Sequence, residues 1–162
     1  MQVEDYTKLW AEVHPGMLAH MKDMHQLLAP HLPSQGLTIT DPVIDTKGDE
    51  FRVTMDIKKG QHVVIGMDYC LVDAMYQEGG DDEYQEGLDL GVGVKLELIG
   101  YGGLAMGGYF PGNFTPEVWT ADVQQILLRV EATPVNSLAR YVVKKALKND
   151  ALRQSLEAAN IL

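Results

Sequence analysis

The sequence has a single cysteine and no long uncharged apolar run. Cys70 stands alone among 162 residues, which excludes an internal disulfide and any zinc or iron–sulfur site built from several cysteines. The most apolar stretch, 63–75, is interrupted by Asp68 and Asp73 and is shorter than the roughly 18 residues that a membrane-spanning helix needs. The N-terminus is acidic where a secretory signal is basic. We therefore expect a cytoplasmic protein with a reduced thiol.

Positive charge is also scarce. The chain has 13 Lys and Arg against 23 Asp and Glu, a net charge of −10, which disfavours direct binding to nucleic acid or to anionic membranes. The excess is unevenly spread: residues 41–97 hold 14 acids and 5 bases, a net of −9, whereas residues 129–157 hold 3 acids and 6 bases, a net of +3. Such segregation suits recognition between proteins.

Apolar periodicity predicts helices at both ends of the chain. A three- and four-residue spacing runs through residues 3–31, with Pro15 predicting a kink or a division into two helices. Met17, Met21 and Met24 share one stripe, which favours a place in the core over an exposed association surface. The helical period returns at Thr115 and again at Thr133, each followed by a proline that suits a first helical turn.

Between these helical regions the period is two. Val53, Met55 and Ile57 alternate with polar residues, as in a strand with one buried face. Residues 37–43 predict an edge strand because Pro42 cannot donate to a sheet, with Leu37, Ile39 and Val43 alternating along it. Residues 69–77 suit either strand or helix.

The order of elements predicts one α+β domain over residues 1–162. Short connections make successive strands antiparallel neighbours, and a meander bracketed by helices is typical of this class. We expect four to five strands, with two to three C-terminal helices covering the sheet. The predicted regions are helical over 1–33, sheet over 37–110 and helical over 115–162.

One segment is strongly acidic. Its spacing does not fit a calcium-binding EF-hand loop. A solvated loop and a weak calcium site are the alternatives to a surface that meets a basic partner protein. We predict that six acids in twelve residues contact this partner: Glu78, Asp81, Asp82, Glu83, Glu86 and Asp89.

The basic residues near the C-terminus fall on one side of a predicted helix. One interpretation is that this side of the helix only contacts solvent. The other is that it is a self-association surface, with the basic helix of one copy contacting acidic sheet loops of another copy in a homodimer or larger homo-oligomer. The residues concerned are Arg140, Lys144, Lys145 and Lys148.

A glycine-rich part of the sheet offers a second candidate surface. Gly91 and Gly93 leave one face of a strand bare, so either a helix packs closely there or a ligand approaches. Tyr101 and Tyr109 lie nearby in the sequence, and paired carboxylates such as Asp68 and Asp73 could share the wet face.

The residues for catalysis or metal binding are poorly placed. The four histidines of the first helix are spread along its length, and we expect them at partly exposed positions: His14, His20, His25 and His31. His14 and His25 share a side but are about 16 Å apart along the axis, too far apart to bind one metal ion. We therefore predict no metal site. We also predict no cofactor and no catalytic residue.

Taken together, the sequence favours a non-enzymatic acidic module that binds a partner protein. It would act by occupying the partner's surface as an inhibitor, a chaperone-like factor or an assembly factor. A basic groove that binds nucleic acid is one such surface. The alternative is a small-molecule-binding or hydrolytic protein that uses the glycine-rich sheet face.

Overall fold

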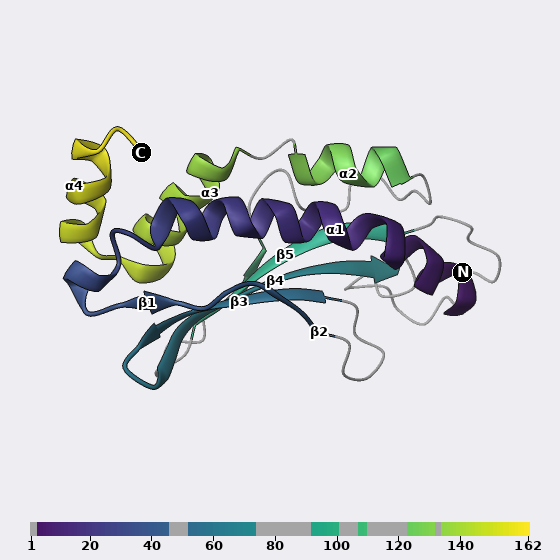
Figure 1. The fold of residues 1–162 in the computed structure, drawn as a ribbon, viewed down its shortest axis with the longest axis horizontal. Coiled ribbons are helices and arrows are strands. Elements are labelled where there is room, and N and C mark those ends of the chain that lie inside the picture. The colour runs from purple at the N-terminus through teal and green to yellow at the C-terminus, as the bar shows by residue number, and fades with distance from the viewer. Residues whose placement is uncertain (1–2, 46–51, 74–91, 101–106, 110–122, 132–133) are drawn as a thin grey trace, which may run out of the picture.

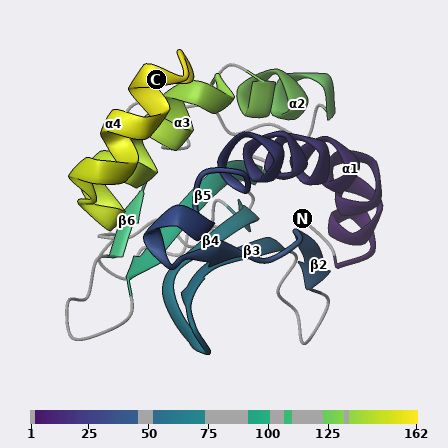
Figure 2. The same cartoon turned by 60° about the vertical axis from the view of Figure 1, so that its left-hand side comes forward.

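The protein has an α+β fold in which helices cover one face of an antiparallel sheet (Figures 1 and 2). The computed structural model describes residues 3–45, 52–73, 92–100, 107–109, 123–131 and 134–162. The strands are β1 (Thr38–Ile39), β2 (Val43–Asp45), β3 (Arg52–Lys59), β4 (His62–Asp73), β5 (Val92–Gly100) and β6 (Gly107–Tyr109). The helices are α1 (Val3–Leu28), η1 (Pro33–Gln35), α2 (Val123–Glu131), α3 (Val135–Tyr141), η3 (Val142–Leu147) and α4 (Asp150–Ala158).

Helix α1 is one continuous helix that lies across the sheet (Figure 1). Pro15 lies inside it and has no N–H to bond the carbonyl one turn earlier, and the helix axis bends toward its N-terminal end. Two separate helices, the other arrangement that the sequence allowed, do not occur. The side chains of Met17, Met21 and Met24 are fully buried, so the methionine stripe belongs to the core and is no exposed surface.

The described strands pair in the order β1-β3-β4-β5-β6, with β2 also on β3, and every pairing is antiparallel. The face toward the helices is apolar: Val53, Met55 and Ile57 of β3 lie opposite Tyr69, Met67 and Ile65 of β4, and all six are buried. The ambiguous stretch after Tyr69 is strand as far as Asp73. We call the other face of the sheet, which carries Arg52, Thr54 and Asp56, the polar face.

The edge of the sheet departs from the predicted alternation. Ile39 pairs with Ile57, whereas Val43 pairs with Thr54, so four steps along the edge match three steps along β3. This extra residue, a bulge at Asp41–Pro42, shifts the following residues to the opposite face. Val43 therefore lies on the polar face and is 55% exposed, although the sequence predicted it on the same face as Ile39.

The C-terminal helices pack on α1 and the sheet. Gly16 of α1 allows the close approach of α2, because a Cβ at this position would lie 2.5 Å from Cδ2 of Leu127. Helix α3 begins one residue after Pro134, whose carbonyl accepts the first helical bond from Leu138; Thr133 lies outside the described residues. The chain then continues into η3, a π-helical segment that the sequence did not predict.

Helix α3 and η3 share one apolar side. Leu138 and Ala139 are buried, and so are Val142 and Val143 four residues later, and this segment contacts α1, α4 and β4. Its remaining side is polar. Among the described residues, no helix combines the length and the apolar character needed to cross a membrane.

Candidate functional site

The structure describes only some of the predicted site residues. The six acids of the segment 78–89, hereafter the acidic stretch, lie outside the described residues, as do Gly91 and Tyr101. Gly93 lies in β5 opposite Val72, and Tyr109 lies in β6 opposite Glu97. The predicted partner-binding surface and ligand face therefore stay predictions.

The predicted basic residues lie on the exposed side of the C-terminal helices. Arg140 is in the last turn of α3, Lys144 is in η3, and Lys148 caps η3 with a left-handed backbone at φ 50°. All three side chains are exposed, and we call this group the basic ridge. Within the described part of the chain, none of the three forms an ion pair or a side-chain hydrogen bond. Lys145 also lies in η3, but its side chain is outside the description.

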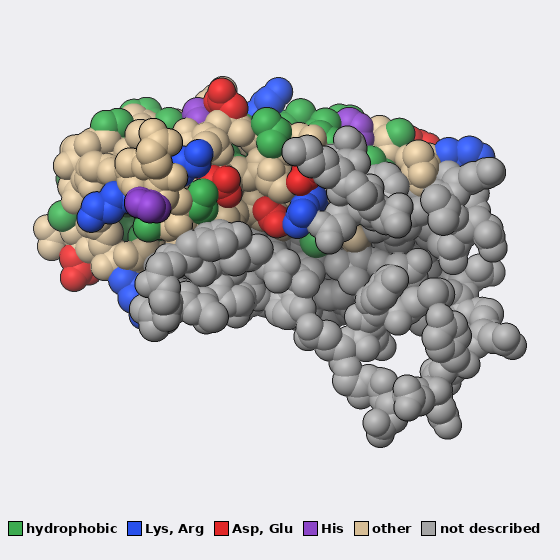
Figure 3. Space-filling view, turned by 90° about the horizontal axis from the view of Figure 1, so that it is seen from below, with side chains coloured by type: hydrophobic (Ala, Val, Ile, Leu, Met, Phe, Trp, Pro, Cys, Tyr) green, Lys and Arg blue, Asp and Glu red, His purple; other side chains and the backbone are tan. Residues whose placement is uncertain are grey.

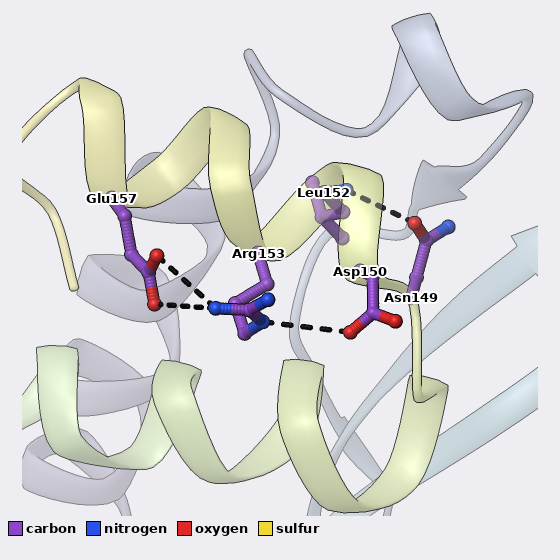
Figure 4. A network of polar contacts seen from close by, with 5 residues as sticks. All are labelled: Asn149, Asp150, Leu152, Arg153 and Glu157. Carbon is purple, nitrogen blue, oxygen red and sulfur yellow. Dashed lines mark hydrogen bonds and ion pairs between the residues drawn. The ribbon is translucent and has the colours of Figure 1, made fainter.

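A fourth base nearby is already neutralised. Arg153 on α4 contacts Glu157 with N···O distances of 3.1 and 3.2 Å and lies 3.5 Å from a carboxylate oxygen of Asp150 (Figure 4). The hydrogen bond to Glu157 is the main cause that raises the pKa of Arg153 above its usual value. Both acids share its own helix, so Arg153 forms local ion pairs, in contrast to the basic ridge.

The polar face of the sheet holds a charged cluster that the sequence analysis did not anticipate. A guanidinium nitrogen of Arg52 lies 3.3 Å from the carboxylate of Asp68 and another lies 3.6 Å from that of Asp45. Asp68 is only 8% exposed. Acidic and basic side chains lie next to one another on the face seen from below (Figure 3). The alternation of β3 and β4 places Arg52 and Asp68 on wet faces, but only the strand register brings them together.

The same register brings further polar residues into line. Asp68 lies opposite Thr54 on one side and Glu97 on the other, and Glu97 lies opposite Tyr109. Residues in register on antiparallel strands share a face, so this row crosses four strands of the polar face. Asp68 and Asp73, one of the carboxylate pairs that could share the wet face, lie five positions apart in a continuous register with β5, so these two positions belong to opposite faces of β4.

Cys70 also lies on the polar face. It is in register with Arg52 on β3 and with Lys95 on β5. Its side chain is half-buried and forms no disulfide. Alternation in β4 puts Tyr69 and Leu71 into the core and turns Cys70 away from it.

The histidines of α1 occupy separate environments. His20 is buried, with its Nδ1 2.9 Å from the hydroxyl oxygen of Tyr69, so the expectation of partial exposure is wrong for this residue. The rings of Trp10 and His14 pack with centroids 5.4 Å apart, and His25 lies 3.4 Å from Asp41. Over the residues that the structure describes, no group of three or more His, Cys, Asp or Glu could hold a metal ion.

Burial also acts on Tyr69 itself. The side chain is fully buried between α1 and β4, and this desolvation raises the pKa of its phenol well above the ordinary value. A neutral phenol bonded to an imidazole in the core acts as a packing element between α1 and the sheet.

Comparison with protein-family models, with curated proteins and with solved structures found no match to this chain.

Proposed function

We propose that this protein is a non-enzymatic acidic module that binds a partner protein through the acidic stretch. It occupies a basic surface of the partner and so acts as an inhibitor, a chaperone-like factor or an assembly factor. A groove that binds nucleic acid is one such surface, because its lysines and arginines are arranged to meet a row of negative charges.

Charge segregation is the observation that carries this proposal. The net charge of −9 over residues 41–97 accounts for most of the total of −10. Arg52, one of only five bases in that region, is already engaged by Asp45 and Asp68. The acidic stretch itself has six acids and no base. A concentrated negative field of this kind steers a basic partner into contact and raises the association rate.

The experiment is capture of partners by the immobilised chain from its native lysate, followed by mass spectrometry. The variant Asp81→Asn, Asp82→Asn, Glu83→Gln removes three of the six charges. We expect the captured partner to have a basic surface, to be lost from the variant, and to elute as NaCl rises from about 0.05 to 0.5 M, where screening shortens the reach of surface charges.

A matched control removes the same number of charges elsewhere. Glu12, Asp23 and Glu131 are exposed on α1 and α2, and Glu12→Gln, Asp23→Asn, Glu131→Gln should retain the partner. Binding that is insensitive to salt, or equal loss from both triple variants, would contradict the proposal.

A second function is favoured by one observation, the row of polar residues across the sheet. Asp68 is buried beside Arg52 and in register with Glu97, which is in turn in register with Tyr109. Acidic residues at neighbouring positions of one sheet face suit general acid–base chemistry. We propose as the alternative that the polar face binds a small molecule or hydrolyses it.

This alternative has its own test. A panel of chromogenic esters, phosphates and glycosides is assayed with the natural chain, with Glu97→Gln and with Asp56→Asn, a control that also lies on the polar face. A hydrolase should lose activity with Glu97→Gln and keep it with Asp56→Asn. Background rates for all three proteins would exclude hydrolysis of these substrates.

A further inference from the structure

We infer that the outer edge of β2 is a docking site for an extended segment of a partner protein, which adds to the sheet as a further strand. This segment carries apolar residues toward α1 and basic residues among them. The inference goes beyond the proposed function, because the site consists of described residues of α1 and β2 and does not include the acidic stretch.

Strand β2 lies at one edge of the sheet (Figure 2). It pairs with β3 through Val43–Asp45, and none of the described strands pairs with its other side. Alternate residues of an edge strand direct their backbone N–H and C=O groups away from the sheet, where an added strand can bond them. Pro42 has no N–H to bond such a strand, so the pairing that we propose begins at Val43.

The edge also exposes apolar side chains. Three large apolar side chains are exposed among the described residues: Val43 at 55%, Ile44 at 36% and Leu128 at 62%. The first two are neighbours in β2. Ile44 is in register with Val53, which is fully buried on the face toward the helices, so Ile44 lies on that face as well. Its exposure shows that α1 leaves the core face partly uncovered at β2.

Helix α1 has a half-buried side next to this edge. His14, Leu18 and His25 are half-buried, and their separations of four and seven residues, close to one and two turns, place them on one side of α1. On this side, Nε2 of His25 lies 3.4 Å from a carboxylate oxygen of Asp41 at the sheet edge. A strand added about 4.8 Å beyond β2 comes next to this side, where its apolar side chains bury Ile44 and Leu18 further.

The charge at the edge favours a basic partner over a second copy of the chain. The side chain of Asp41 is 91% exposed, and its neighbour His25 is a cation only when protonated. A second copy would bring the same carboxylate and another net charge of −10 to the edge, and like charges on neighbouring strands are destabilising. A lysine or arginine of the added strand instead pairs with Asp41 and is attracted by the charge of the whole chain.

The experiment uses synthetic heptapeptides, whose side chains and backbone can be varied separately. The probe alternates valine with lysine, and a comparison peptide alternates valine with glutamate. A third peptide repeats the probe with every second amide N-methylated, so that one of its edges cannot donate to a strand. Fluorescence anisotropy with the full chain should show that the probe binds at least about tenfold more tightly than either other peptide.

Two lysine variants locate the site. Ile44→Lys places a charge on the core side of the edge, a substitution of the kind that blocks pairing in natural edge strands, and should weaken binding of the probe about tenfold. Leu128→Lys adds the same charge at the exposed apolar residue of α2 and should change binding by less than about twofold.

Two further variants test the charge at the edge. Asp41→Asn should weaken binding of the probe about threefold, as expected for one exposed ion pair. Asp23→Asn removes an exposed carboxylate of α1 and should leave binding unchanged.

NMR on the natural chain needs no substitution at the edge. The probe should shift the amide signals of Val43–Asp45 and of α1 around Leu18, and it should slow hydrogen exchange in β2. Shifts confined to other elements, binding of the N-methylated peptide as tight as that of the probe, or equal effects of Ile44→Lys and Leu128→Lys would overturn the inference.

Two other outcomes separate this inference from its alternatives. Association of the natural chain with itself, accompanied by protection of the β2 amides, would assign the edge to a second copy and overturn the choice of partner. The variant Asp81→Asn, Asp82→Asn, Glu83→Gln should bind the probe within about twofold of the natural chain. Loss of binding in that variant would place the probe on the acidic stretch, which contradicts this inference and leaves the proposed function standing.

Discussion

Tyr69 and His20 show how a polar group is accommodated in this core. Tyr69 belongs to the middle of β4 and His20 to the middle of α1, and their side chains meet at 2.9 Å inside the layer between helix and sheet. The two rings also pack edge to face, with centroids 5.6 Å apart. The bond thus joins α1 to β4 at a defined position, in addition to the apolar contacts around it.

Tyr69→Phe keeps the ring and removes the hydroxyl. We expect a loss of about 1–2 kcal/mol in the free energy of unfolding, because the buried His20 loses this partner. Urea denaturation measures the change. A double-mutant cycle with His20→Leu should give a coupling of at least about 0.5 kcal/mol; additive effects would mean that the bond contributes nothing to stability.

The same variant has a pH signature. Burial raises the pKa of Tyr69 in the folded chain above the ordinary value of about 10. The folded state therefore keeps its proton when the unfolded state loses it, and stability is lost as pH rises above about 10. The difference between the natural chain and Tyr69→Phe should shrink by about 1.4 kcal/mol per pH unit there; a constant difference would contradict this.

Met21 tests the role of the methionine stripe. Its side chain is fully buried against the sheet, so Met21→Ala should cost about 2–4 kcal/mol through lost contacts and a cavity. The exposed neighbour Lys22 is the control, and Lys22→Ala should change stability by less than about 0.5 kcal/mol. A stability change for Met21→Ala as small as that of the control would contradict its core position.

The ends of the helices and strands, and the irregularities within them, determine how these elements are arranged. The bulge at Asp41–Pro42 ends β1 and starts β2 one residue out of step, while η3 continues α3 as a π-helical segment. Asn149 then starts α4, because its side-chain oxygen accepts a hydrogen bond from the backbone N–H of Leu152 at 3.0 Å (Figure 4).

The cap of α4 can be tested directly. Asn149→Ala should lower the free energy of unfolding by about 1 kcal/mol, since it leaves an N–H of the first turn without its acceptor. Asn149→Ser should restore most of the loss. Gln154, exposed on the same helix, gives a control whose change to Ala should stay within about 0.5 kcal/mol. Equal effects of Asn149→Ala and Asn149→Ser would argue against capping.

At the scale of the whole molecule, the net charge of −10 dominates. Self-repulsion of like charges destabilises a compact state, and salt screens it. The negative charge is concentrated in residues 41–97, whereas bases exceed acids in residues 129–157. The charge of the chain is therefore polarised along the sequence.

We accordingly expect the free energy of unfolding to rise as NaCl increases from about 0.01 to 0.15 M. The variant Asp81→Asn, Asp82→Asn, Glu83→Gln has a net charge of −7 (−10 plus 3), so its gain with salt should be smaller. A stability that falls with salt in this range would show that specific ion pairs outweigh the general repulsion.

Apolar periodicity predicted the α+β class, the buried face of β3 and the burial of the methionine stripe. A period of 3.6 residues marks one face of a helix and a period of two marks one face of a strand, so both can be found in the amino-acid sequence. The same period placed Arg140, Lys144 and Lys148 on the solvent side of a helix, opposite its apolar stripe.

Which polar residues meet depends on the tertiary structure. The contact of Arg52 with Asp68, the row from Thr54 to Tyr109 and the bond between His20 and Tyr69 each join segments distant in the sequence. Their pairing depends on strand register and on how α1 lies over the sheet. A shift of one residue, as at Asp41–Pro42, changes the face on which every later side chain of a strand lies. Such a shift cannot be predicted from the local sequence pattern.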